Sequence, residues 1–303
     1  MMDITQLSYY DRRTGELKQD PIYARGLVDW LYNSSPGWFL TEFLLSRRWL
    51  SCFYGWLNKR RWTRRKIKPF ATHLALNLDE FSRPLDAFES FNDFIIREID
   101  LSSRPIQGDP EVCIAPADGR VLTYPVINAE HSIVIKRATF NLRTLLRDEE
   151  LATAYSGGSL FVSRLYLTDY HHFHFPDDGI ARPAVSIPGQ YFAVSPYPER
   201  KLVPFYAENH RMVTLFDADH FGQVVMIEVG AFTIGTIQQR YQAGVRVRKG
   251  DHKGFFELGG SIVVLLFRKN AIRFDDDLCR NTLSGIETYV HLGESIGRAA
   301  SQR

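Results

Sequence analysis

Hydrophobic and polar residues follow two different periods along the chain. The spacing of apolar residues over positions 37–57 predicts an amphipathic helix, and residues 88–100 carry a second, shorter helical pattern. From about Val112 onward, short apolar runs alternate with turn residues, which is typical of an antiparallel-rich sheet. We therefore predict an α+β fold. N-terminal helices are expected in residues 1–105, followed by an antiparallel-rich β sandwich or barrel-like catalytic domain in residues 106–303.

A basic and aromatic segment follows the first predicted helix. No acidic residue occurs between Phe43 and Leu78, and the run NKRRWTRRKIKPF contains seven basic residues. An aromatic helix next to such a run is the composition of an interfacial membrane anchor, and each basic residue near an anionic leaflet contributes about 1 kcal/mol. A helix packed on the domain with a solvated basic face has the same composition. Interleaved basic and aromatic residues also suit nucleic acid, and the composition of this segment leaves the three possibilities open.

Composition restricts the cellular setting. The chain has 303 residues and a formal net charge of +2, which gives no indication of binding to nucleic acid. Its three cysteines, Cys52, Cys113 and Cys279, are far apart, so neither a disulfide framework nor a CxxC metal site is expected. The N-terminus lacks the apolar core of a signal peptide, and the most apolar stretch, Trp38–Leu57, is interrupted by charged residues. We expect a peripheral protein without a transmembrane helix.

Two segments of the β-rich part carry candidate chemistry. Residues 115–119, APADG, place Asp118 among turn residues, so an ordinary turn explains them as well. The segment YHHFHFP holds three of the nine histidines: His171, His172 and His174. In a strand, His172 and His174 share one face. Such a cluster suits a zinc site, a general base or a structural hydrogen-bonded cluster, and the pattern leaves these three open.

Gly259-Gly260-Ser261 stands at the beginning of an apolar, β-branched run, where glycine weakens a strand. Asp118, one of the three histidines and Ser261 supply the residue types of a catalytic triad, although the GxSxG elbow is absent. Gly260 has no Cβ beside its carbonyl group, so a neighbouring hydroxyl can approach that carbonyl. The arrangement suits attack of Ser261 on its own preceding peptide bond.

Five motifs follow one another along most of the chain. FNDFIIRE resembles FxxFFxR, APADGR matches PADG, DYHHFHFPDDG resembles YHRxHxPxxG, VGAFTIGTI resembles VGAxxVGSI, and KGDHKGFFELGGS resembles KGxExGxFxxGGS. Each motif alone is a weak signal, whereas five in order are specific. The set resembles the phosphatidylserine decarboxylase family, whose members are pyruvoyl-dependent membrane enzymes.

The resemblance implies a self-cleaving chain. Asp118, His174 and Ser261 would form the relay for cleavage, with His174 as general base and Asp118 orienting it. Ser261 would attack the Gly260 carbonyl and give an ester, after which elimination and hydrolysis leave a pyruvoyl group. The products are a β chain of residues 1–260 and an α chain of residues 261–303, which would remain together as a heterodimer.

The resemblance also implies the reaction and its location. The covalent pyruvoyl group derived from Ser261 would form a Schiff base with phosphatidylserine and act as electron sink while phosphatidylethanolamine and CO₂ form. His171 would take part in the decarboxylation step as a proton donor. No metal is implied. We expect the enzyme on the cytoplasmic side of a bacterial inner membrane, where residues 1–105 would bind the anionic surface peripherally. A homo-oligomer is compatible with this expectation.

Three departures from the family pattern matter for the expected function. His172 stands at the arginine of YHRxH, Ile262 stands where threonine often follows the serine, and Arg137 replaces a glycine in the segment IKRATFNL. The histidine substitution enlarges the cluster and leaves the division of roles among His171, His172 and His174 open.

Three other functions account for parts of the sequence. A pyruvoyl-dependent decarboxylase could act on another amino-acid-type substrate, although the basic aromatic N-terminus argues against a soluble one. A zinc hydrolase could use His171, His172 and His174. A peripheral membrane-binding protein, in which Gly-Gly-Ser is only a turn, would show no self-cleavage.

Overall fold

The computed structural model describes most of the 303-residue chain. The described residues are 8–20, 26, 30–31, 34–40, 43, 48–128, 133–135, 138–190, 205–230, 237–257 and 261–300. Gly260 and Arg137, which the sequence singled out, lie outside these residues.

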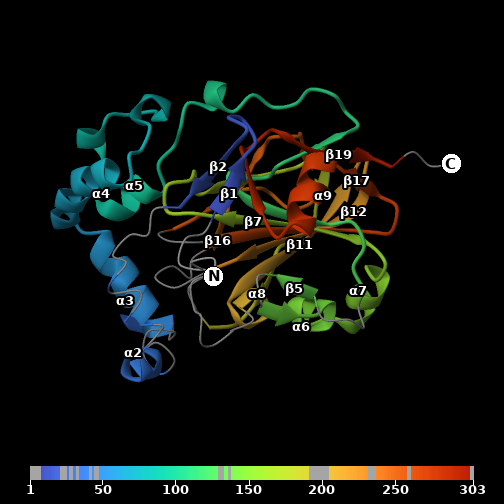
Figure 1. Ribbon diagram of the computed structural model, residues 1–303, viewed down its shortest axis with the longest axis horizontal. Coiled ribbons are helices and arrows are strands. Elements are labelled where there is room, and N and C mark those ends of the chain that lie inside the picture. Colours follow the sequence, from blue (N-terminus) through green and yellow to red (C-terminus); the bar gives the residue numbers. More distant parts are fainter. Residues whose placement is uncertain are drawn as a thin grey trace.

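One large sheet runs through the centre of the molecule (Figure 1). Its pairs are antiparallel, except that β1 and β18 run parallel. The antiparallel-rich character of the predicted β region is therefore confirmed. Across the sheet the strands are β14 (Arg246–Val247), β9 (Gly179–Ala181), β11 (Arg211–Ala218), β12 (Gly222–Val229), β16 (Ser261–Phe267), β7 (Ser159–Leu165), β4 (Gly119–Tyr124), β18 (Glu287–Val290), β1 (Ser8–Asp11) and β2 (Glu16–Gln19), with β10 (Val185–Ile187) paired to β11.

The described strands do not close into a barrel. Their order ends at β14 on one side and at β2 on the other. The barrel-like arrangement, one of two that the sequence left open, is therefore corrected to an open sheet. Alternating strand patterns do not reveal closure, because closure depends on which strands lie at the edges.

Three smaller sheets lie beside the large one. The first contains β13 (Ile237–Gln239), β15 (His252–Phe256) and β8 (His172–His174); the second contains β17 (Ile272–Phe274), β19 (Ser295–Ala299) and β3 (Val112–Ile114); the third contains β5 (Ile133–Ile135) and β6 (Ala138–Phe140). The first of these sheets carries the histidine cluster of the sequence.

The N-terminal region contains short helices as well as one unexpected hairpin. The helix predicted over residues 37–57 corresponds to α2 (Ser35–Leu40) and α3 (Arg48–Asn58), with residues 41–42 and 44–47 between them outside the described part. The hairpin of β1 and β2 was not predicted. Its turn contains Gly15 at φ 73°, a backbone conformation that glycine adopts readily.

The helix predicted over residues 88–100 is shorter than expected. It is α5 (Phe91–Ile95), and the Ser90 side chain caps it by accepting a hydrogen bond from the Asp93 amide at 3.1 Å. Ile99 instead forms an isolated β-bridge with Phe81, which ends the helical part of the segment.

The other helical elements are α4 (Ile67–His73), α6 (Leu142–Leu146), α7 (Glu149–Ala154), α8 (Phe205–Glu208), α9 (Asp276–Leu283) and the 3₁₀ turns η2 (Arg61–Lys66), η3 (Leu78–Glu80), η4 (Leu85–Ala87) and η5 (Leu101–Ser103).

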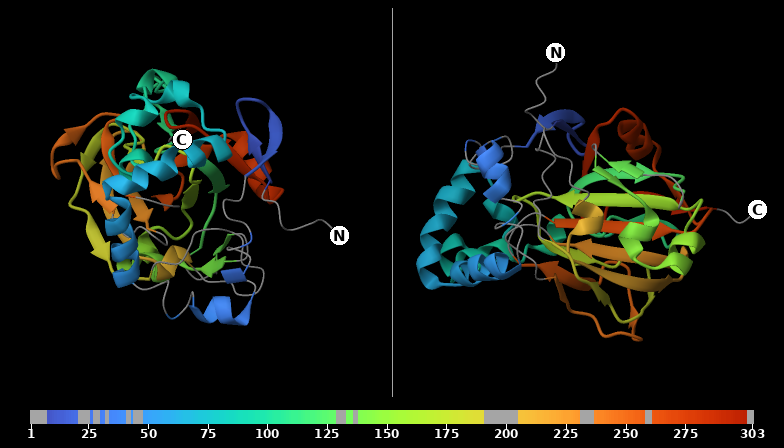
Figure 2. Two further views of the ribbon diagram at one scale, coloured as in Figure 1. Left: turned by 90° about the vertical axis from the view of Figure 1, so that its left-hand side faces the viewer. Right: turned by 90° about the horizontal axis from the view of Figure 1, so that it is seen from below.

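Helices α3, α4 and α5 lie at one end of the β-rich body (Figure 2). Residues of α4, α5 and the segment between them form their own apolar cluster, in which Phe70 and Phe88 pack against Phe94 at ring distances of 6.0 and 5.4 Å. No helix among the described residues is long and apolar enough to cross a membrane.

Strand β16 lies in the middle of the core. All seven of its residues are buried, and the strand pairs with β7 on one edge and with β12 on the other. Its side chains alternate between two apolar clusters, because Val264 and Leu266 pack into one and Leu265 and Phe267 into the other. A strand that is covered on both faces reads as a continuous apolar run, which is what the sequence shows.

Candidate active site

Backbone hydrogen bonds bring the predicted site segments together. The His174 amide donates to the Pro116 carbonyl at 2.7 Å, which joins β8 to the turn that contains Asp118. The Phe175 amide donates to Asp251 at 2.9 Å, and β15 pairs with β8, so the loop before β15 lies against the histidine segment. Segments that are far apart in the sequence therefore meet around β8.

Ser261 is the first residue of β16 and pairs with Leu165 of β7. Only 1% of its surface is exposed, and its Oγ has no hydrogen-bond partner among the described residues. A buried hydroxyl without a partner costs about 1–3 kcal/mol, so such groups concentrate where a structure needs them for another purpose.

His174 presents an unprotonated ring nitrogen. Its Nδ1 lies 2.9 Å from the Gly250 carbonyl oxygen, which can only accept a hydrogen bond, so Nδ1 carries the proton of the neutral ring. Burial lowers the pKa of His174 to about 4, which keeps the ring neutral near pH 7. The lone pair is then on Nε2, a buried atom without a partner among the described residues. These are the properties of a general base.

Asp118 is held by a cation and does not hydrogen-bond to the histidine ring. Arg104 Nε and Nη2 donate to its carboxylate at 3.0 and 2.9 Å, and the Leu292 amide donates at 2.8 Å. Burial alone would raise the pKa of Asp118, but Arg104, His291 and the Leu292 amide together lower the pKa below its ordinary value. The negative charge of Asp118 in turn raises the pKa of His174, an effect smaller than that of burial.

His171 is oriented by the turn before it. Its Nδ1 lies 2.8 Å from the Asp169 carbonyl oxygen, so Nδ1 carries a proton and Nε2 is the other proton-exchanging atom. The side chain of Asp169 pairs with Arg120 of β4 and accepts a hydrogen bond from the Tyr166 amide at 2.6 Å. The main sheet thereby fixes the turn that positions His171.

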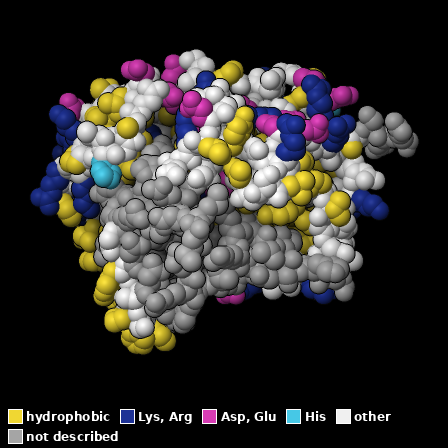
Figure 3. All heavy atoms as spheres, in the orientation of Figure 1, with side chains coloured by type: hydrophobic (Ala, Val, Ile, Leu, Met, Phe, Trp, Pro, Cys, Tyr) yellow, Lys and Arg dark blue, Asp and Glu magenta, His cyan; other side chains and the backbone are white. Residues whose placement is uncertain are grey.

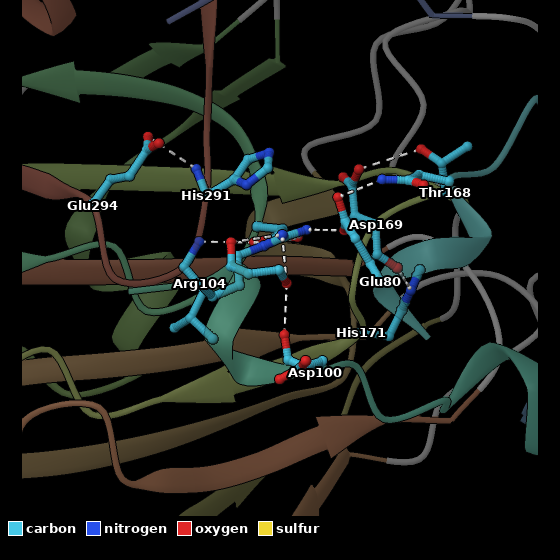
Figure 4. Close-up of polar contacts among 12 residues, drawn as sticks. Glu80, Asp100, Arg104, Thr168, Asp169, His171, His291 and Glu294 are labelled. Atoms are coloured by element: carbon cyan, nitrogen blue, oxygen red, sulfur yellow. Dashed lines mark hydrogen bonds and ion pairs between the residues drawn. The ribbon is translucent and has the colours of Figure 1, made fainter. Parts of the chain in front are cut away.

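Two arginines complete the surroundings of the site, and the sequence analysis did not single them out. Arg104 bridges Asp118 and Glu80, the latter at 2.8 Å (Figure 4). Arg97 is buried and donates to the carbonyls of Thr168 and Asp169 at 2.5 and 3.2 Å. Arg97 is the arginine of the FNDFIIRE motif, which could have indicated it, whereas no sequence signal marks Arg104.

The histidine cluster does not form a metal site in the described part of the chain. No group of three or more histidine, cysteine or carboxylate side chains there is placed to hold a metal ion. His172 instead hydrogen-bonds through Nδ1 to His252 Nε2 at 2.9 Å and through Nε2 to the Ile96 carbonyl at 3.0 Å. Both ring nitrogens of His172 are thus already engaged, which argues against the zinc hydrolase alternative.

Comparisons with known proteins agree on one family. The family model described as phosphatidylserine decarboxylase matches residues 91–298. A phosphatidylserine decarboxylase proenzyme of Chlamydia pneumoniae is 41% identical over 291 residues, which is 96% of this chain and 97% of the relative. The proenzyme of Desulfitobacterium hafniense (strain DSM 10664 / DCB-2) is 40% identical over 96% of this chain and 98% of its own. That of Chlamydia muridarum is 39% identical over 99% and 100%.

The low pKa of His174 makes the stability of the fold depend on pH. The ordinary histidine pKa is 6.5 and that of His174 is about 4, so on acidification the unfolded chain takes up the proton first. The contribution of the neutral ring to stability is therefore fully present above pH 6.5 and is lost as the pH falls toward 4. We expect His174→Gln to reduce the pH dependence of the unfolding free energy in this window by ~1.4 kcal/mol per pH unit.

Urea unfolding at several pH values measures this dependence. The matched control is His73→Gln, at an exposed position on α4, and it should leave the slope of the wild type unchanged. Equal slopes for the wild type and His174→Gln would show that His174 is not held neutral by burial.

Proposed function

The chain belongs to the phosphatidylserine decarboxylase family, and from this premise we propose how its own residues carry out the reaction. The chain is a phosphatidylserine decarboxylase that forms phosphatidylethanolamine and CO₂. Its relatives are named proenzymes, which fits a chain that must be cleaved before it acts. The observation that carries the proposal is the burial of Ser261 Oγ and His174 Nε2 without partners among the described residues.

Self-cleavage begins at Ser261. Its Oγ bonds to the Gly260 carbonyl carbon while the hydroxyl proton passes to His174 Nε2, the lone-pair atom of a neutral ring. The C–N bond then breaks, the Ser261 nitrogen takes the proton, and an ester remains. Elimination of the Gly260 carboxylate leaves a dehydroalanine. Its imine form adds water and loses ammonia, so the new N-terminus at residue 261 is a pyruvoyl group.

Asp118 supports this step through its charge. Arg104 and the Leu292 amide keep the carboxylate ionised although it is buried. The charge stabilises the imidazolium that His174 becomes when it takes the serine proton. The Gly250 carbonyl, and not Asp118, is the group that orients the His174 ring. Asp118 therefore acts here as an electrostatic partner within the proposed relay.

Ser261 is buried and its Oγ has no partner among the described residues, which fits a residue that is converted into a pyruvoyl group. When formed, that group supplies a carbonyl that takes up the substrate amine and accepts electrons as CO₂ leaves. His171 would hold the proton that the substrate Cα needs after CO₂ has left, and deliver it from Nε2. The Asp169 carbonyl keeps the ring in the orientation required.

A surface of α3 and η2 is suited to a membrane. The exposed side chains of Phe53, Trp56 and Trp62 lie among basic residues, and Arg60 stacks on Trp56 at 3.9 Å. Figure 3 shows hydrophobic side chains gathered at the end of the molecule where α2 and α3 lie, with lysine and arginine along the neighbouring edge. We propose that this surface holds the enzyme peripherally on an anionic membrane. It lies within residues 1–105, the region that the sequence analysis associates with the membrane.

Ser261→Ala should abolish cleavage and activity together, because it removes the nucleophile and the source of the pyruvoyl group. Intact-mass spectrometry of the active wild type should show fragments 1–260 and 261–303, the second blocked at its N-terminus. An intact, unmodified 34.9 kDa chain in an active preparation would contradict the proposal.

The histidines should separate cleavage from turnover. In freshly translated chains, Asp118→Asn and His174→Ala should block cleavage, whereas His171→Ala should allow cleavage but lose turnover by ~100-fold or more, as expected for a general acid. Gel analysis of cleavage and a CO₂ release assay measure the two steps. His73→Ala, on the surface of α4, serves as control and should cleave normally. Complete loss of cleavage in His171→Ala would reverse the roles of the two histidines.

Charge reversal on η2 should weaken membrane binding. Because each basic residue contributes about 1 kcal/mol, Arg61→Glu/Arg65→Glu should lower binding to phosphatidylserine-containing vesicles by about tenfold or more in flotation. The matched control, Arg273→Glu/Arg280→Glu, reverses two exposed charges in the C-terminal segment and should bind as the wild type does. Equal loss in both variants would mean that net charge, and not this surface, determines binding.

A further inference from the structure

His172 and His252 form a hydrogen-bonded pair between two strands. His172 lies on β8 and His252 on the neighbouring β15, and their rings stand 4.9 Å apart at 32°. His172 Nδ1 and His252 Nε2 are 2.9 Å apart. On its other side, His172 stacks on Tyr170 at 4.4 Å with an interplanar angle of 5°. The ring of His172 is thus held by stacking on Tyr170 and by hydrogen bonds at both nitrogens.

The neighbouring carbonyl groups determine the direction of this hydrogen bond. His172 Nε2 lies 3.0 Å from the Ile96 carbonyl, so it carries a proton, and Nδ1 of the neutral ring accepts. His252 Nε2 is therefore the donor to His172. It also lies 3.0 Å from the Gly254 carbonyl, which accepts the same proton. The arrangement joins the end of α5, β8 and β15 in one chain of hydrogen bonds.

Both members of the pair depart from the family pattern. YHRxHxPxxG has arginine at the position of His172, and KGxExGxFxxGGS has glutamate at the position of His252. His252 lies opposite His174 in the pairing of β15 with β8, so positions 172 and 252 are diagonal neighbours whose side chains meet. Arginine and glutamate at these two positions would be close enough to form an ion pair. In this chain both charged residues are replaced, and the two replacements hydrogen-bond to each other. If arginine and glutamate had been lost independently of each other, the residues that replaced them would have no reason to form a hydrogen bond.

We propose that His172 and His252 are positioning residues, and that their hydrogen bond replaces an arginine–glutamate ion pair in holding the strand that carries His174. The proposal rests on the self-cleavage proposed above. Strand β8 has only three residues, so side-chain contacts contribute much of what fixes its position. His174 lies two residues from His172, and its ring stands 5.2 Å from that of His252.

Such a pair tolerates one proton but not two. A first proton, on His252 Nδ1, leaves the Nε2–H donor in place. A second proton, on His172 Nδ1, removes the acceptor and places two cations side by side. Burial lowers the pKa of His172 to about 3 and lowers the pKa of His252 as well. The charged and titratable groups that face the three rings are His171, Tyr170, Arg240, Glu98, Asp118 and Asp251.

Restoring the ion pair tests the proposal. We expect His172→Arg and His252→Glu each to slow self-cleavage of freshly translated chain about tenfold or more, because each leaves a charge beside a neutral ring. The double variant should return to within about threefold of the wild-type rate. A double variant no faster than the product of the two single effects would overturn the proposal.

A conservative pair of variants separates hydrogen bonding from shape. His252→Gln keeps an N–H donor for His172 Nδ1 without a titratable ring, so cleavage should stay within a few-fold of the wild type. His252→Leu fills similar space without a donor and should be as slow as the charged single variants. Equal rates for the two would show that the hydrogen bond has no positioning role.

The same cycle in a Ser261→Ala chain distinguishes this proposal from the proposed function. Urea unfolding of this uncleaved protein should show that the two substitutions are less destabilising together than their sum. If the wild type does not self-cleave, the proposed function fails while this coupling still tests the pair. If cleavage occurs and coupling is absent from both measurements, the pair is not a positioning unit.

Discussion

The double-sided burial of β16 is the constraint on which the rest of the structure depends. The strand lies between β7 and β12, all seven residues are buried, and its side chains enter apolar clusters on both faces. Moving it by one residue would exchange the two faces and disrupt both clusters. Ser261 is the first residue of this strand, so the position of its hydroxyl is set by the best-packed element of the fold.

The same packing explains how a cleaved chain would remain one molecule. After the proposed cleavage, residues 261–303 would have no covalent link to the rest. They would still contribute β16 to the main sheet, β18 between β4 and β1, and β19 beside β3. These strands are interleaved with strands from residues 8–260, and their ladder hydrogen bonds and buried side chains do not depend on the peptide bond before Ser261.

Buried ion pairs connect the small sheet that carries His172 and His174, and the turn that carries Asp118, to the rest of the fold. Lys253 of β15 is fully buried and pairs with Glu228 of β12 at 2.9 Å, with Thr214 and Gln239 completing its hydrogen bonds. This ion pair connects the small histidine-bearing sheet with a neighbour of β16. Arg104 similarly connects Asp118 with Glu80 in the N-terminal region. Buried pairs of this kind are costly to break, because removing one partner leaves the other charge uncompensated.

The sequence by itself determined the residue types of the candidate site and the β-strand content after Val112, because turn residues, apolar runs and motif spacing are local properties. It singled out Asp118, His171, His174 and Ser261 as candidates, and it predicted the antiparallel-rich β character of the chain after Val112. Tertiary structure alone decided that the sheet stays open. It also decided the pairing of β1 with β18, the Arg104–Asp118 contact and the His172–His252 hydrogen bond. Each joins segments that are far apart along the chain, and only packing decides which of several possible partners a buried charge or ring nitrogen meets.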